Sequence, residues 1–478
     1  MPGNYGHAFL KKHFVAQDRV LTLDGLCAGF AVFAKIIFLS SLNNYNNLTK
    51  LIDKIANTEP KVLAKEISNL KKFYKTENIK GSLALLPGDQ DILNVSIMFD
   101  IISIFSQPKM YIKQLGKHIS QPNIDEILEV ILPKYFGNLH KAGGLTKVGS
   151  LPLIFNGKDE VSKQFLNLLA DLQSISKKDK PSRMSLIFGS MDHRIHIGYD
   201  PGLDKWVLSD INFLSKIKKT FDHAEIANAL LTCLRSEGET ESIAFNVSTY
   251  VASANKDKYL AQQKSLTKKY NKLFTIENAA LERSPEEKTW HAKKTNQGVT
   301  YAHIAAKFGN TKILDLMSQR NPGLVTQQTV LGYTPLYLAA SQNQQKSLEF
   351  LMEDISSLDY KHCADIAVGA AHSCNIEVMK QIEERGFTFS EGDLARFFEK
   401  ACKVNDLVKA QFCIDYMHYK KININKPLPI GYGPGAKELP PLIIAQLARR
   451  RSIVLMLLKA GAAMPDEKGA PEIKMAMR

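Results

Sequence analysis

The stretch Asp24–Phe30, DGLCAGF in one-letter code, opens the longest apolar run of the chain and places a cysteine where a helix should begin. We expect Asp24 to act as the N-cap, which puts Cys27 in the first turn of that helix. The unpaired backbone N–H groups and the helix dipole at that end favour a thiolate, which is the nucleophilic form of the side chain. Cys27 is therefore a candidate nucleophile.

The apolar run Gly25–Leu42 also raises the question of a membrane span. It carries Lys35, two glycines and two serines, and it barely reaches the length that a span requires. A helix that is apolar nearly all round is equally typical of the centre of a globular domain. We predict a buried helix.

A possible base and its orienting group lie far along the chain. Met191–Tyr199 alternates in a strand-like pattern, Asp200–Asp204 supplies turn residues, and Lys205–Asp210 returns as a second strand. Such a hairpin brings His193 and Asp210 to the same end of a sheet. His193 would then deprotonate Cys27 and later protonate the leaving group, while Asp210 would orient the imidazole. His196 faces the other side of the strand and is the second candidate for the base.

The composition indicates which broad class of protein this chain belongs to. A chain of 478 residues with 45% hydrophobic and 23% charged residues fits two or three globular domains. The net charge of +14 would attract nucleic acid or an acidic membrane, but neither a zinc-finger spacing nor an aromatic-basic module is present, and we expect a solvated basic surface. The six cysteines form no CxxC pair, so we predict a reducing compartment, no metal and no other cofactor. The first sixteen residues lack the apolar segment of a secretory signal.

The last part of the chain is repetitive. Gly298–Asn310 recurs as Gly332–Ala340, and the two glycines are 34 positions apart, close to the period of about 33 that ankyrin repeats have. Weaker copies start near residues 370, 400 and 439. These stretches resemble ankyrin repeats, and we expect an all-α solenoid of about four to five repeats over residues 296–478. Residues 236–295, which are polar and charged, are predicted to form a helical connector after a domain that spans residues 1–235.

A Pro- and Gly-rich insertion, residues 421–438, interrupts the last repeats. Insertions in solenoids map to loops on one face, which often binds a partner. We expect an extended finger there that contacts a protein, with Tyr432 as the candidate contact residue. A passive loop is the alternative.

Three short motifs carry a second resemblance. They are Gly25–Phe30, His193–Ile197 and Asp210–Asn212, and together they resemble the papain-like cysteine proteases of the YopT type, although Ala31 stands where those proteases commonly have a serine. The resemblance implies an α+β, papain-like N-terminal domain with Cys27, His193 and Asp210 as catalytic residues. Gln17 is a candidate donor to the oxyanion.

A papain-like domain followed by ankyrin repeats resembles the Legionella-type ankyrin-repeat effectors. This resemblance implies secretion by a specialised system into a host cell, action in the host cytoplasm or nucleus, and a host protein as partner. The expected function is cleavage of that protein. A catalytically silent scaffold and a cysteine acyltransferase are the alternatives.

Overall fold

The computed structural model describes residues 5–16, 26–40, 42–76, 87–106, 124–156, 158–178, 180–191, 193–218, 220–234, 242–270, 294–295, 297–354, 367, 369–371, 375–384, 389–404, 406–430 and 437–463. The chain divides into two compact units, Met1–Pro335 and Leu336–Arg478. The first unit mixes helices with a large sheet, and the second is mainly helical.

The centre of the first unit is a six-stranded sheet in the order β1-β6-β2-β3-β4-β5. Every neighbouring pair of strands is antiparallel. The hairpin predicted from Met191–Asp210 is present, because β3 and β4 pair from His196↔Ser209 to Asp200↔Lys205. The strands are β1 (Leu145–Asn156), β2 (Met184–Gly189), β3 (Arg194–Asp200), β4 (Lys205–Ser209), β5 (Thr220–Phe221) and β6 (Ser242–Ala252).

Strand β6 corrects the predicted boundary at residue 235. Residues 236–295 are expected from their polarity to form a helical connector, but Ser242–Ala252 lies inside the sheet and pairs with both β1 and β2. The helix α11 (Lys256–Tyr270) then packs back on the sheet unit, where Tyr259 is buried and its hydroxyl donates to the Ser182 carbonyl at 3.0 Å. The sheet domain therefore extends at least to α11.

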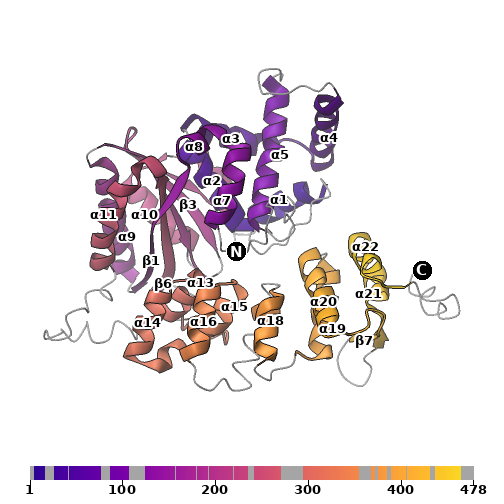
Figure 1. The fold of residues 1–478 in the computed structure, drawn as a ribbon. Coiled ribbons are helices and arrows are strands. Elements are labelled where there is room, and N and C mark those ends of the chain that lie inside the picture. Colours follow the sequence, from indigo (N-terminus) through magenta and orange to yellow (C-terminus); the bar gives the residue numbers. More distant parts are fainter. Residues whose placement is uncertain are drawn as a thin grey trace. The chain divides into compact units, whose positions relative to one another are not determined.

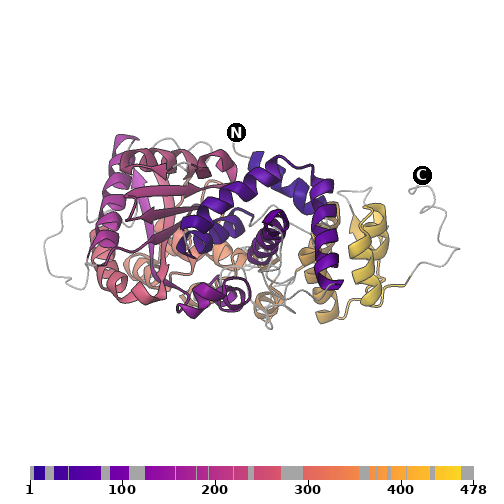
Figure 2. The same cartoon turned by 90° about the horizontal axis from the view of Figure 1, so that it is seen from above.

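Helices cover both faces of the sheet (Figures 1 and 2). On one face, α9 (Lys158–Lys177), α10 (His223–Leu234) and α11 enclose an apolar core with the side chains of Leu186, Ile195 and Trp206. On the other face the helical layer packs on Ile187, Val207 and Tyr250. Its helices are α1 (Tyr5–Ala16), α2 (Leu26–Ser40), α3 (Leu42–Ala56), α4 (Pro60–Thr76), α5 (Pro87–Ser106), α7 (Ile124–Tyr135) and α8 (Gly137–Lys141).

The helix α2 is the buried helix that the apolar run predicts. Twelve of its fifteen residues are buried, and it lies between the sheet and α5. Its one charged side chain, Lys35, lies over the Tyr250 ring, with Nζ 3.5 Å from the ring centroid. Among the described residues, no helix combines the length and the hydropathy needed to cross a bilayer.

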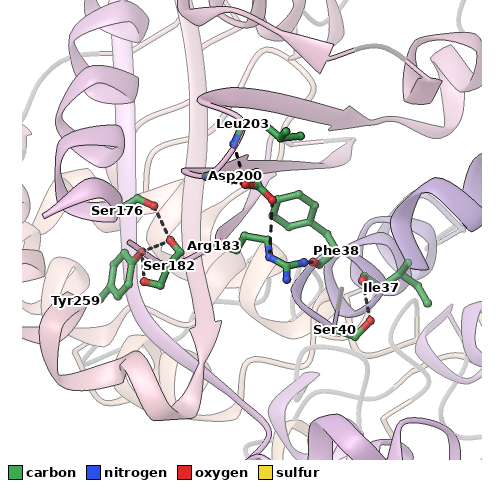
Figure 3. A network of polar contacts seen from close by, with 10 residues as sticks. Ile37, Phe38, Ser40, Ser176, Ser182, Arg183, Asp200, Leu203 and Tyr259 are labelled. Atoms are coloured by element: carbon green, nitrogen blue, oxygen red, sulfur yellow. Dashed lines mark hydrogen bonds and ion pairs between the residues drawn. The ribbon is translucent and has the colours of Figure 1, made fainter. Parts of the chain in front are cut away.

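Polar contacts fix the C-terminal end of α2 on the sheet (Figure 3). Arg183, just before β2, donates from Nη1 to the Phe38 carbonyl at 2.9 Å. Its Nε lies 3.8 Å from Asp200 Oδ2, and Asp200 Oδ1 accepts from the Leu203 N–H at 3.2 Å. One end of α2 is thus tied to the β3–β4 turn, and the opposite end carries Cys27.

Gly29 allows α2 to pack closely on α5, and its replacement should be costly. A Cβ at this position would lie 2.6 Å from the Ile102 carbonyl oxygen and 2.7 Å from Ser106 Oγ. We expect Gly29→Ala to lower the free energy of unfolding by about 1–3 kcal/mol, as overpacking does, in a denaturant titration. Gly392→Ala is the control, because Gly392 lies in the first turn of α19 (Glu391–Val404) and the nearest atom to an added Cβ, Ser390 Oγ, is 3.7 Å away. Equal stability of Gly29→Ala and wild-type protein would contradict this packing.

The repeats begin within the first unit. Helix α13 (Tyr301–Phe308) starts with a capping box in which the Thr300 backbone N–H donates to His303 Nδ1 at 3.1 Å. The other ring nitrogen, Nε2, donates to the Tyr333 carbonyl at 3.0 Å and so links two repeats. Burial lowers the pKa of His303 to about 4, which keeps the ring neutral and suited to this double role.

The remaining repeat helices follow in pairs. In the first unit α14 (Thr311–Arg320) packs on α13, and the short η7 (Pro322–Val325) follows it. In the second unit, α19 packs on α20 and α21 packs on α22. Their bounds are α15 (Pro335–Ser341), α16 (Gln345–Asp354), α18 (Ile376–Glu383), α19 (Glu391–Val404), α20 (Leu407–Tyr419), α21 (Pro441–Leu447) and α22 (Arg451–Lys459).

The inserted finger is a β-hairpin where it is described. Strand β7 (Leu428–Ile430) pairs antiparallel with β8 (Lys437–Leu439). Tyr432 lies outside the described residues, as do the other residues of 431–436. Its partner contact therefore stays a prediction.

Candidate active site

Cys27 is the second residue of α2 and is partly buried against the helical core. Backbone N–H groups in the first turn of a helix have no acceptor within the helix, so this end favours a negative charge. The predicted N-cap Asp24 and the predicted oxyanion donor Gln17 lie outside the described residues.

His193 lies on the loop between β2 and β3. The loop closes on itself, because the Ser190 N–H donates to the His193 carbonyl at 2.9 Å and the His193 N–H donates to Ser190 Oγ at 3.2 Å. The imidazole is 11% exposed, and it lies close enough to the Cys27 thiol for each group to shift the pKa of the other. The sheet loop and the start of α2 thus bring a base to the thiol.

Asp210 follows β4 directly and is completely buried at its carboxyl group. Oδ1 lies 2.8 Å from His193 Nε2 and also accepts from the Asn212 N–H at 2.8 Å. Since Nε2 is engaged by Asp210, Nδ1 is the nitrogen left for Cys27. The structure brings the three predicted residues together, with the Cys27 thiol beside the hydrogen-bonded pair of His193 and Asp210.

The charged forms of Cys27 and His193 stabilise each other. Burial alone would raise the pKa of the Cys27 thiol, but the hydrogen bond and positive charge of His193, together with Arg194, lower that pKa below its usual value. Burial alone would lower the pKa of the His193 imidazole, but the hydrogen bonds to Asp210 and Cys27 raise that pKa to about 10. Both shifts favour a thiolate beside an imidazolium.

Arg194 is a site residue that the sequence motifs do not reveal. Both its backbone N–H and its guanidinium lie close enough to Cys27 to lower the pKa of the thiol. The one feature of the sequence that could have pointed to Arg194 is its position directly after the candidate base His193. The contact itself depends on how α2 crosses β3, which no local pattern encodes.

His196, the second candidate for the base, has a different role. It is fully buried between α2 and α3, 5.7 Å from the Phe38 ring and 6.4 Å from the Tyr45 ring by centroid. Nδ1 lies 3.1 Å from Ser209 Oγ, which in turn lies 2.9 Å from the Tyr45 hydroxyl. Burial and the charge of Lys35 lower the pKa of His196 to about 3. This histidine is a neutral core residue.

The other described cysteines contrast with Cys27. Cys233, Cys402 and Cys413 are buried, and burial raises the pKa of Cys402 to about 12. In the part of the chain that the structure describes, no cluster of three or more metal-ligating side chains is present. The arrangement can activate a thiol and move one proton at His193.

Comparison with known proteins supports the assignment of ankyrin repeats in the C-terminal part of the chain. The family model for ankyrin repeats, in three copies, matches residues 269–362. This part of the chain consists of ankyrin repeats, which are modules for protein–protein interaction. Among curated proteins, nothing matches the chain.

Proposed function

We propose that the first unit is a papain-like cysteine hydrolase that cleaves a peptide or isopeptide bond in a protein selected by the ankyrin repeats. The observation that carries this proposal is the position of Cys27, at the start of a buried helix and beside the hydrogen-bonded pair of His193 and Asp210. A helix that presents a cysteine to a histidine and an aspartate on an antiparallel sheet is the arrangement such enzymes use.

The chemistry follows from the two charges. The Cys27 thiolate attacks the carbonyl carbon, forming a C–S bond, and the His193 imidazolium gives its proton to the leaving amine as the C–N bond breaks. Neutral His193 then takes a proton from water, which attacks the thioester, and the C–S bond breaks to release the carboxylic acid product. Asp210 holds the imidazole in place through both steps. The backbone N–H groups at the start of α2 are suited to stabilise the oxyanion.

The proposal extends to the setting in which the protein acts. The union of this site with ankyrin repeats supports an effector secreted into a host cell, where the repeats bind a host protein in the cytoplasm or nucleus. An acyltransferase would use the same thioester, with an acceptor other than water.

Covalent labelling tests the hydrolase. A peptidyl electrophile of the type that traps cysteine proteases is expected to modify Cys27 with a stoichiometry near one, because the thiolate reacts where thiols do not. Peptide mapping by mass spectrometry locates the adduct, and heat-unfolded protein is the control. Label spread evenly over the six cysteines would contradict the proposal.

A catalytically silent scaffold is the second candidate function. The ankyrin match favours it, because ankyrin repeats bind proteins and do not themselves catalyse a reaction. It predicts that the partner is captured without being cleaved.

A further inference from the structure

Helix α13, the first ankyrin helix among the described residues, packs against the sheet of the candidate enzyme within the same compact unit (Figure 1). Helix α13 contacts β1 and β6, and the phenol oxygen of Tyr301 is hydrogen-bonded to the backbone of Ile154 in β1. Every residue from Tyr301 to Lys307 is buried. A helix of a solenoid ordinarily contacts only neighbouring repeats, so this burial shows an additional attachment.

The C-terminal end of α13 reaches the loop that carries His193. Lys307 Nζ donates to the carbonyl of Met191, two residues before the histidine. Lys307 is only 8% exposed, so its ammonium group is held in a largely water-free position where such a bond is strong.

Phe308 contacts both ends of the same loop. Its ring lies so close to Gly189 that a Cβ there would be 2.5 Å from Cζ, which explains the glycine at the end of β2. The Arg194 guanidinium lies over the ring, with Cζ 5.4 Å from the centroid. Because Arg194 lies close enough to Cys27 to lower the pKa of its thiol, Phe308 packs on a neighbour of the candidate nucleophile.

These contacts bear on a geometric requirement of the site. Cys27 comes from the helical layer and His193 from a sheet loop, and a displacement of the loop by about 1 Å would lengthen the bond between them. The hydrogen bonds between Ser190 and His193 set the shape of the loop, and the contacts with α13 hold it in position at the end of β2 and β3.

We propose that Lys307 and Phe308 are positioning residues that hold the Gly189–Arg194 loop, and with it the imidazole of His193, against Cys27. The ankyrin repeat that contains α13 is therefore a structural part of the active site. This inference rests on the proposed function, since it assigns a role toward the same Cys27–His193 pair.

The test compares matched lysine variants in the full chain. Lys307→Met keeps the aliphatic stem and removes the donor, Lys307→Arg restores a donor, and Lys312→Met changes an exposed lysine on α14. The readouts are the rate of Cys27 alkylation by iodoacetamide between pH 5 and pH 9 and the melting temperature. We expect Lys307→Met to lower the rate at pH 6 by about tenfold and to make it rise with pH. Lys307→Arg should recover most of the rate, and Lys312→Met should match the wild type.

Phe308→Leu serves as a second variant if Lys307→Met unfolds, and the same change in its pH profile is expected. Wild-type alkylation rates and profiles in both variants, with or without a lower melting temperature, would overturn the inference and leave the proposed function intact. A wild-type protein with no enhanced rate at pH 6 would instead overturn the proposed function itself.

Discussion

Replacement of Cys27 by alanine is expected to abolish cleavage of the bound protein, with a loss of about 10⁴-fold or more, while the fold and partner capture persist. Loss of a covalent nucleophile removes the acylation step altogether, and what remains is the small effect of binding and oxyanion stabilisation. The side chain is partly buried and small, so alanine fits its place on α2 without a clash.

The measurement uses a lysate of eukaryotic cells, incubated with wild-type or variant protein, in which new protein N-termini are labelled and identified by mass spectrometry. Isopeptide cleavage appears in the same samples as loss of a branched peptide at lysine. Ala28→Gly, on the neighbouring residue, is the control for a helix that is merely perturbed. Identical termini with wild-type protein and Cys27→Ala would contradict the enzymatic account and favour the scaffold.

The second large effect is expected for His193→Gln. The glutamine side chain keeps a hydrogen-bonding group near Asp210 but cannot carry a proton as the imidazole does. Burial is the largest single influence on Cys27, and without His193 only Arg194 opposes it, so the pKa of the thiol rises and less thiolate is present at neutral pH. Cleavage should fall by a factor similar to that of Cys27→Ala, and alkylation of Cys27 at pH 6 by about tenfold or more.

Asp210→Asn is the companion variant, because it retains the imidazole and removes only the charge that stabilises it. We expect a smaller loss than for His193→Gln, as orienting carboxylates generally contribute less than the base. An alkylation rate for His193→Gln equal to that of the wild type would show that the histidine does not activate the thiol.

The sequence predicts those parts of the site that are encoded locally. Cys27 follows a helix-start pattern, and His193 and Asp210 flank an alternating hairpin whose turn residues are readable, so their meeting at one sheet end could be inferred. The repeats are readable because their period is regular. The buried helix follows from the apolar run around Phe30.

Other parts depend on contacts between distant segments. Strand β6 is flanked by polar sequence and joins the sheet between β1 and β2. This non-local pairing could not be predicted from residues 242–252 alone. The closeness of Arg194 to Cys27 depends on the crossing of α2 over the sheet. Phe308 of an ankyrin repeat contacts Gly189 at the end of β2. No sequence pattern in either segment predicts that the two meet.

The pH dependence of Cys27 alkylation in the wild-type protein tests the thiolate–imidazolium pair most directly. Peptide mapping after timed exposure to iodoacetamide gives the rate for Cys27, with buried Cys402 and Cys413 as internal references. Because the pKa of Cys27 is lowered and that of His193 is raised to about 10, the rate should already be high at pH 6 and change little up to pH 8. A rate that rises about tenfold with each pH unit over this range, as for an ordinary thiol with a pKa near 9.0, would contradict the account.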